Sequence, residues 1–276
     1  MIKFWVAACS FGLLTACGGG GSASQTVAAP EYNIEVSSLR YSQPTTFTIT
    51  GTQIDKISHV NVSKCDGVVN SGASAGSSKT LTCTVSGTGD LKVELQNAQN
   101  EVLFGKTWTV ALPQVQLTTT SGNLLVELDP SAAPLTVNNF LAYVHSGFYT
   151  NTLIHRVISN FVVQGGWLTN APAVQSGQRA PIVLESNNGL SNLRGTIGMA
   201  RMSEANTATS QFYFNVVDNP ALNFVDTAQP GYAVFGKLVK GLDVLDAIAA
   251  QPTGSKFGLP NAPLTDVVVL KAEQLQ

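Results

Sequence analysis

The sequence predicts a mainly β protein in which a small β-sandwich precedes a closed antiparallel eight-stranded barrel that is capped by two helices. Three observations point to this fold class. Gly, Ser, Thr, Val and Asn are abundant, which favours strands and turns over long helices. Short runs of alternating apolar and polar residues, separated by turn residues, fill most of the chain. Only two stretches have the periodicity of an amphipathic helix.

The composition limits the possible partners. The chain has 276 residues, of which 44% are hydrophobic and 12% charged, which is typical of one or two globular domains. Its formal net charge of −2 excludes a broad basic field of the kind that holds nucleic acid. The cysteine spacing does not suit a metal site, and no histidine cluster accompanies it. We therefore expect no nucleic acid partner, no metal and no cofactor.

Residues 1–16 have the pattern of a lipoprotein signal peptide. Lys3 precedes an apolar run that is too short to span a bilayer as a mature helix. The run ends in LTAC, which resembles the bacterial lipobox and implies cleavage before Cys17 and acylation of this cysteine. Residues 17–30 then form a flexible tether. Because Gly18 replaces aspartate, the resemblance implies the periplasmic face of the outer membrane rather than the inner membrane. The alternative is an ordinary cleaved signal with an incidental cysteine.

Residues 31–112 form a separate β module. Its alternating runs, such as FTITG, TLTCTVS and LKVEL, predict a small immunoglobulin-like sandwich. Cys65 and Cys83 remain once the signal and the lipidation site are set aside, and in the periplasm such a pair is a candidate disulfide. Two buried free thiols are the alternative. The module has no catalytic constellation, and it could serve as a spacer or as a binding domain.

Residues 113–276 contain the elements of the barrel. VQLTTTSGNLLVELD is typical of a strand, a Ser-Gly turn and a second strand. Pro134 opens a helical pattern that Gly147 is placed to end, and a second short helix is expected over residues 242–250. Strands and loops fill residues 152–240, and DVVVLKA is a final strand. Two helices among roughly eight strands indicate a closed antiparallel barrel with a helix at each end.

One strand contains an unexpected cation. In IHRVISNFVVQGG, Arg156 lies in an apolar run, although arginine is rarely buried without a partner. A structural pair with a carboxylate is one explanation. His155 should face the opposite way and be a core histidine with satisfied hydrogen bonds rather than an acid or base. Further along, alternation puts Gln211, Tyr213 and Asn215 on one face of QFYFNV, with apolar residues on the other. Such a polar and aromatic face fits a groove on a barrel wall.

Four blocks carry a family resemblance. IHRVISNFVVQGG, GTIGMAR, TSQFYFNV and GYAVFGKLVKGLDVLDAI occur in an order and spacing that resemble the cyclophilins, which are peptidyl-prolyl cis–trans isomerases, and most closely their bacterial periplasmic branch. The resemblance covers residues 114–275 and implies a cyclophilin-like barrel that accelerates X–Pro rotation in exported proteins. It implies that Arg156 is catalytic. The substrate-binding positions that it implies are Phe161, Val162, Gln164, Ala200, Arg201, Gln211, Tyr213, Leu222 and Tyr232.

The chain departs from the family pattern at one wall of the implied pocket. Ala221 stands where the family usually has tryptophan or phenylalanine, and Phe224 is the candidate to fill the gap. In the family the indole at this position donates a hydrogen bond to cyclosporin, so the resemblance implies weak cyclosporin binding. Two alternatives to an isomerase stay open: a proline-peptide binding module with little turnover, and a chaperone or scaffold lipoprotein that works through residues 31–112.

Overall fold

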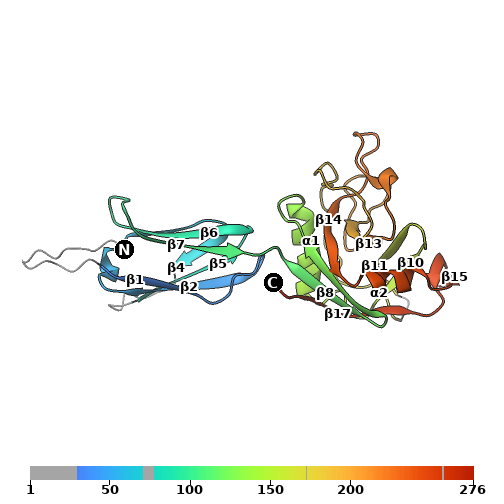
Figure 1. Cartoon of the computed structure of the whole chain (residues 1–276), viewed down its shortest axis with the longest axis horizontal. Helices are drawn as coiled ribbons and strands as arrows, with labels where there is room; N and C mark the ends of the chain where they lie inside the picture. The colour runs from blue at the N-terminus through green and yellow to red at the C-terminus, as the bar shows by residue number, and fades with distance from the viewer. Residues whose placement is uncertain (1–29, 71–77, 172, 257) are drawn as a thin grey trace, which may run out of the picture. The chain divides into compact units, whose positions relative to one another are not determined.

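The structure is a computed structural model that describes residues 30–70, 78–171, 173–256 and 258–276 (Figure 1). The expected signal peptide, the expected lipidation site Cys17 and residues 18–29 of the tether lie outside the described residues. Within the described ranges, no helix is long and apolar enough to cross a membrane.

Two sheets that share one apolar core make up the region from Tyr32 to Val110. Phe47 and Leu81 of one sheet and Leu91 and Val93 of the other belong to this core. The first sheet has the order β1-β2-β5-β4 and the second β3-β6-β7. This is the strand order of constant-type immunoglobulin domains, so the predicted immunoglobulin-like sandwich is confirmed. The elements are β1 (Tyr32–Val36), β2 (Pro44–Gly51), η1 (Ile54–Lys56), β3 (His59–Val62), β4 (Cys65–Asn70), β5 (Ser78–Val85), β6 (Gly89–Gln96) and β7 (Val102–Val110).

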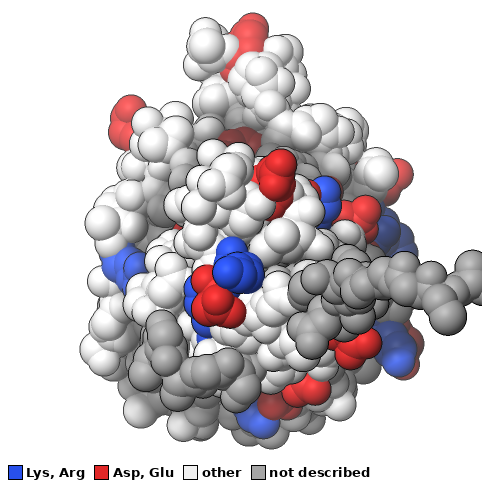
Figure 2. Space-filling model, turned by 90° about the vertical axis from the view of Figure 1, so that its left-hand side faces the viewer, with Lys and Arg blue, Asp and Glu red and all other residues white. Residues whose placement is uncertain are grey.

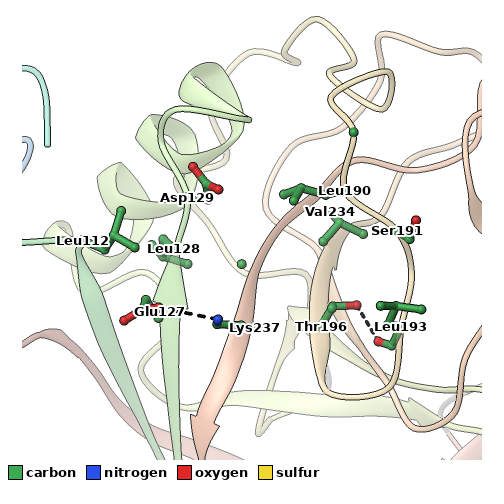
Figure 3. Close-up of a pocket in the computed structure, with 12 residues that line it drawn as sticks. Leu112, Glu127, Leu128, Asp129, Leu190, Ser191, Leu193, Thr196, Val234 and Lys237 are labelled. Atoms are coloured by element: carbon green, nitrogen blue, oxygen red, sulfur yellow. Dashed lines mark hydrogen bonds and ion pairs between the residues drawn. The ribbon is translucent and has the colours of Figure 1, made fainter. Parts of the chain in front are cut away.

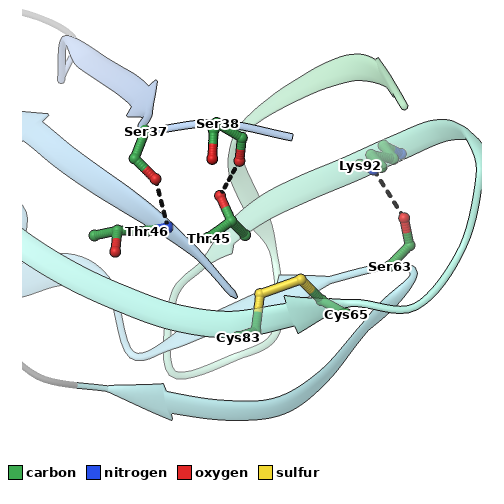
Figure 4. Close-up of a disulfide and its surroundings, with 8 residues drawn as sticks. All are labelled: Ser37, Ser38, Thr45, Thr46, Ser63, Cys65, Cys83 and Lys92. Carbon is green, nitrogen blue, oxygen red and sulfur yellow. Dashed lines mark hydrogen bonds between the residues drawn. A yellow bond between two sulfur atoms is a disulfide. The ribbon is translucent and has the colours of Figure 1, made fainter. Parts of the chain in front are cut away.

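A disulfide joins Cys65 and Cys83, as expected for this pair (Figure 4). The two residues lie on neighbouring strands of one sheet, β4 and β5, with Cα atoms 5.7 Å apart. The bond therefore lies within a sheet, whereas the disulfide of antibody domains joins the two sheets. β4 is an edge strand whose residues after Cys65 are all exposed, so it has little core of its own. Closing a loop of this size stabilises the fold by roughly 3 kcal/mol in the chain-entropy model.

Eight antiparallel strands close into a barrel in the order β10-β11-β13-β12-β14-β9-β8-β17, which confirms the predicted architecture. The hairpin β8–β9 turns at Thr120 and Ser121, where the sequence predicted a turn. The strands are β8 (Gln114–Thr119), β9 (Gly122–Leu128), β10 (Thr152–Val157), β11 (Val162–Thr169), β12 (Thr196–Met199), β13 (Phe212–Asn215), β14 (Val234–Lys240) and β17 (Val267–Gln274).

Two α-helices, α1 (Pro134–His145) and α2 (Leu242–Ala249), bury their apolar faces in the barrel core. Phe140 of α1 packs against the rings of Tyr149, Phe212 and Phe235, with centroids 5.2 to 5.8 Å apart. The N-cap position of α1 is an alanine, which cannot accept the free N–H groups of the first turn. The carboxylate of Glu185 accepts those of Leu135 and Thr136 instead, at 3.0 and 2.8 Å.

One hairpin was not predicted from the sequence. β15 (Thr253–Lys256) and β16 (Leu259–Pro263) form a two-stranded sheet outside the barrel. Their segments, TGSK and LPNAP, contain the glycine and prolines that weaken a strand pattern, so no alternating signal identifies them.

Candidate active site

A pocket of about 190 Å³ opens on the barrel wall and is lined by residues of β10, β11 and β13 and of the segments that connect the strands. It brings together residues that are up to 76 positions apart, from Arg156 to Tyr232. Every substrate-site residue that the sequence singled out lines this pocket except Gln211. The lining residues are Arg156, Phe161, Val162, Gln164, Ala200, Arg201, Tyr213, Leu222 and Tyr232.

Three neighbouring strands position the polar side of the pocket. Arg156 of β10 lies opposite Gln164 of β11, and Gln164 lies opposite Tyr213 of β13. A guanidinium N–H of Arg156 donates to Oε1 of Gln164 at 3.0 Å. Nε2 of Gln164 in turn donates to Oε1 of Gln211 at 2.9 Å. Gln211 therefore supports the pocket through Gln164, because its amide fixes the glutamine that orients the arginine.

Arg156 has no carboxylate partner among the described residues, which removes the explanation of a structural ion pair. Its guanidinium carbon lies 5.8 Å from the centre of the Phe161 ring, within cation–π range. A guanidinium has five N–H donors and stays charged throughout the accessible pH range. One donor is used by Gln164, so Arg156 presents a half-buried positive charge and further donors to the pocket.

The apolar floor comes from a turn and two strands. Ile158 and Phe161 close a tight turn through a 2.9 Å backbone hydrogen bond, and Phe161 therefore projects from the turn rather than from a strand. Val162 and Tyr213 are 2% and 4% exposed and form the deepest part of the lining. The turn resolves a difficulty in the sequence pattern, since strand alternation alone cannot place Phe161 beside Val162 and Gln164.

Arg201 and Tyr232 form the opposite rim. The guanidinium of Arg201 lies 4.6 Å from the centre of the Tyr232 ring, and Tyr232 meets Tyr213 edge to face with centroids 6.0 Å apart. Nε of Arg201 donates to the carbonyl of Gly231, so this side chain holds the loop that presents Tyr232. The N–H of Ala200 donates to the carbonyl of Gln211 at 2.9 Å and is already used within the barrel.

His155 lies next to Arg156 in sequence but outside the pocket lining, as strand alternation predicts. It is 5% exposed and packs edge to face on Trp167, with ring centroids 5.5 Å apart. Its Nδ1 has no hydrogen-bond partner in the described structure, so the sequence-based expectation of a fully satisfied core histidine was wrong in this detail. Burial lowers the pKa of His155 to about 4, and the positive charge of Arg156 acts in the same direction.

Ala221 does not line the pocket. This residue is exposed on the short 3₁₀ helix η2 (Pro220–Leu222), and only Leu222 of this helix lines the pocket. Phe224 is half-buried but is not among the lining residues. The idea that Phe224 fills the gap left by Ala221 therefore finds no support in the structure.

A second hollow, of about 340 Å³, lies between β9, β14 and the loop at residues 189–193 (Figure 3). Its charged side chains have partners within the chain. Glu127 pairs with Lys237 at 3.9 Å, and Asp129 accepts the backbone N–H groups of Ser131 and Ala132. Both carboxylates therefore have partners within the chain, whereas Arg156 has no ion-pair partner among the described residues.

Neither a metal site nor a basic patch stands out in the part of the chain that the structure describes. No group of three or more His, Cys, Asp or Glu residues there could hold a metal ion. On the described part of the face in Figure 2, lysine and arginine side chains lie beside acidic ones and do not gather into one patch.

Sequence reasoning missed the asparagines behind the pocket. The hydroxyl of Tyr213 donates to Oδ1 of Asn192 at 2.6 Å, and Asn192 also contacts Asn215, Asn219 and Asn223. Burial raises the pKa of Tyr213 above its ordinary value, so the hydroxyl keeps its proton and remains a donor. Asparagine in loops is common as a turn former, so no pattern in the sequence distinguishes these residues.

Comparisons with known proteins place the barrel in a family. Residues 114–274 match the family model described as cyclophilin type peptidyl-prolyl cis-trans isomerase/CLD. Peptidyl-prolyl cis-trans isomerase A of Dickeya dadantii is 47% identical over 161 residues, which are 58% of this chain and 83% of that protein. Peptidyl-prolyl cis-trans isomerase B of Escherichia coli is 42% identical over 55% of this chain and 93% of that protein.

A solved structure agrees with these relatives. The cyclophilin type peptidyl-prolyl cis-trans isomerase of Cryptosporidium parvum superposes with a TM-score of 0.50 at 26% identity and covers 60% of this chain and 99% of its own. The barrel, its pocket and the family match coincide along the sequence. This chain belongs to the cyclophilin-type peptidyl-prolyl cis–trans isomerases.

Proposed function

We propose that this chain accelerates rotation about X–Pro bonds by stabilising the twisted amide through Arg156. Partial double-bond character gives this rotation a barrier of roughly 20 kcal/mol. When the amide twists, resonance is lost and the prolyl nitrogen becomes a hydrogen-bond acceptor. A donor aimed at this nitrogen interacts more strongly with the transition state than with the planar substrate, which is the condition for catalysis.

The observation that carries this proposal is the half-buried guanidinium of Arg156, which is held by Gln164 but faces no carboxylate among the described residues. Beside it, Phe161, Val162 and Tyr213 form an apolar surface suited to a proline ring. The reaction makes and breaks no covalent bond, so positioning and electrostatic stabilisation suffice. Because Arg156 stays charged and His155 stays neutral above about pH 4, we expect kcat/KM to be flat between about pH 6 and pH 8.

An isomerase assay on a short X–Pro peptide separates this function from a binding module with little turnover. The full chain should accelerate cis–trans exchange, measured by NMR exchange or by protease coupling. Binding without acceleration would favour the proline-peptide module. The relatives support a barrel that folds alone, since the match to this chain covers 93% of the Escherichia coli isomerase. Deleting residues 31–112 should therefore leave peptide turnover intact, whereas a scaffold acting through the sandwich would lose its function.

We also propose that the protein is exported, lipidated at Cys17 and anchored to the periplasmic face of the outer membrane, where proline-containing exported proteins are its substrates. The support is the LTAC block and the Gly-rich segment after it. Three acyl chains bury enough CH₂ groups for stable anchoring. Cys17→Ser should move the protein from the membrane fraction to the soluble fraction and abolish lipid labelling. A wild-type protein that carries no lipid label would overturn the assignment.

A further inference from the structure

Asn192 occupies an unusual place between the two hollows of the barrel. It lies in the loop that precedes β12 and is 1% exposed. Its neighbours Ser191 and Leu193 are exposed and line the second hollow, as Figure 3 shows. Asn192 is not among the lining residues of that hollow, and its side chain is hydrogen-bonded to the floor of the candidate active site. A buried asparagine is costly unless its amide is fully used, so its partners indicate what it does.

The first set of contacts reaches the pocket floor. Oδ1 of Asn192 accepts the hydroxyl of Tyr213 at 2.6 Å and an amide N–H of Asn215 at 3.2 Å. Tyr213 is confined on a second side by Gly198. A Cβ at Gly198 would lie 2.4 Å from the Tyr213 hydroxyl oxygen, which only the absence of a side chain avoids. Asn192 therefore holds the hydroxyl end of the Tyr213 ring, and the missing side chain of Gly198 leaves room for this ring.

The second set of contacts holds both ends of η2, the helix that supplies Leu222 to the pocket wall. At its start, the carbonyl of Asn192 accepts the N–H of Asn219 at 2.8 Å. At its end, the backbone and side-chain N–H groups of Asn192 both donate to Oδ1 of Asn223, at 2.7 and 3.1 Å. η2 has three residues, none of them buried, and no side-chain cap at its N-cap residue. Such a short helix has little stability of its own, so these bonds hold Leu222 in place together with the 2.9 Å bond from the N–H of Tyr232 to the carbonyl of Leu222.

We propose that Asn192 is a positioning residue that sets the width of the proline pocket by linking Tyr213 on its floor to η2 on its wall. The inference rests on the proposed function, because it assigns the pocket to a proline ring. Asn192 acts on the fit of the ring and has no hydrogen bond to Arg156 or to Gln164 among its contacts, so its loss should weaken peptide binding rather than slow the rotation of a bound peptide. Tyr213 and Leu222 are the groups through which it acts.

Steady-state and NMR measurements on three variants and one control variant test this role. Asn192→Ala should raise KM and the peptide Kd roughly tenfold while kcat stays within about threefold of wild type. Tyr213→Phe, which removes only the hydroxyl, should raise KM less. The double variant should match Asn192→Ala, because both changes remove the same hydrogen bond. Asn188→Ala is the matched control: Asn188 is bonded within the same loop and to the carbonyl of Val234, but it does not touch the pocket.

Several results would overturn the proposal. These are an unchanged KM in Asn192→Ala, a fall in kcat at constant KM, or a rise in KM equal to that of Asn188→Ala. Additive effects of Asn192→Ala and Tyr213→Phe would also contradict it. If Asn192→Ala fails to fold, Tyr213→Phe still tests the link, since an unchanged Kd in this variant refutes it. The peptide Kd, followed by NMR titration, reports on the pocket even in a chain without turnover, so failure of this inference is distinguishable from failure of the proposed isomerase function.

Discussion

Two regions of the barrel each contain an arginine, but the two guanidinium groups have different kinds of partner. At the loop before β12, Arg194 makes two parallel hydrogen bonds of 2.8 Å to the carboxylate of Asp246 on α2, and a third bond of 2.7 Å to the carbonyl of Val216. This pairing holds the pKa of Asp246 below its usual range. At the pocket, Arg156 makes one 3.0 Å bond to the neutral amide of Gln164 and faces no carboxylate among the described residues.

The difference concerns where the positive charge can act. A guanidinium paired with a carboxylate has its field neutralised locally, and its planar donors are occupied. A guanidinium oriented by a neutral amide keeps both its charge and its free donors. The first arrangement connects two parts of the fold, whereas the second keeps a cation ready for a group that becomes an acceptor only during the reaction.

Replacing each arginine by alanine should affect activity very differently, and the loss at Arg156 is the largest effect expected. Arg156→Ala should lower kcat/KM for a short X–Pro peptide by roughly 10² to 10³, the usual cost of losing a preorganised donor to the transition state. Arg194→Ala should leave kcat/KM within about twofold of wild type. Initial-rate assays on both folded variants check the pair. Equal losses in the two variants would show that the contrast between them has no catalytic meaning.

Ala221 adds a difference in surface to this difference in charge, because the family resemblance implies an aromatic side chain at this position and the chain has alanine. Cyclosporin should bind wild type roughly two to three decades more weakly than it binds Ala221→Trp, since an indole supplies both a hydrogen bond and aromatic contact area. Peptide turnover should change less. Inhibition titrations of the two proteins provide the measurement, and nanomolar inhibition of wild type would show that another residue closes this wall.

His155 tests whether a buried base next to Arg156 affects stability rather than catalysis. Its pKa is about 4 in the folded protein, against an ordinary value of 6.5. The unfolded chain therefore takes up a proton first as the pH falls. The folded state loses stability from about pH 6.5 down to about pH 4, by about 3 kcal/mol in total.

Urea unfolding of wild type and His155→Phe, followed through NMR signals of the barrel, measures this effect. Wild type should lose about 3 kcal/mol more than the variant between pH 7 and pH 4, because phenylalanine keeps the ring contact with Trp167 and removes the titration. Parallel pH dependences in the two proteins would exclude His155 as the cause.

The ion pair of Arg194 should give the smallest effect. Both side chains are well exposed, so Arg194→Ala should lower the free energy of unfolding by at most about 1 kcal/mol at neutral pH. The pKa of Asp246 is depressed in the fold, so this contribution is present above the ordinary carboxyl pKa of 3.8 and is lost as the pH falls further. Thermal unfolding of wild type and Arg194→Ala at pH 7 and at about pH 2 measures this contribution. A difference in stability between the two proteins that persists at low pH would contradict the prediction.

Local patterns predicted most of the elements in this fold. Pro134 starts α1 and Gly147, with φ +71°, follows its end, because each has the backbone geometry that its position needs. Alternation placed Phe212 and Phe214 in the core and Gln211 and Tyr213 toward the pocket. These features depend on residues that are close in sequence, so they can be predicted from one sequence.

Features that depend on distant contacts could not be predicted in this way. Alternation indicated a bend near Ser159 and Asn160, and the turn that carries Phe161 into the pocket is found there, but its direction was not predicted. Asn192 owes its role to Tyr213 and Asn223, which lie 21 and 31 positions away. The residues that line the pocket were predicted through their resemblance to a family. The asparagine network behind them was not predicted, because an asparagine in a surface turn and a buried asparagine with several hydrogen bonds look alike in the sequence.

The most direct test of the central claim separates binding from rotation in Arg156→Ala. NMR titration gives the Kd of an X–Pro peptide, and exchange spectroscopy gives the cis–trans rate of the bound peptide. If Arg156 acts on the twisted amide, the Kd should stay within about threefold of wild type while the bound rate falls by roughly 10² to 10³. A Kd that rises by this factor while the bound rate is unchanged would show that Arg156 only holds the substrate, and would contradict the account.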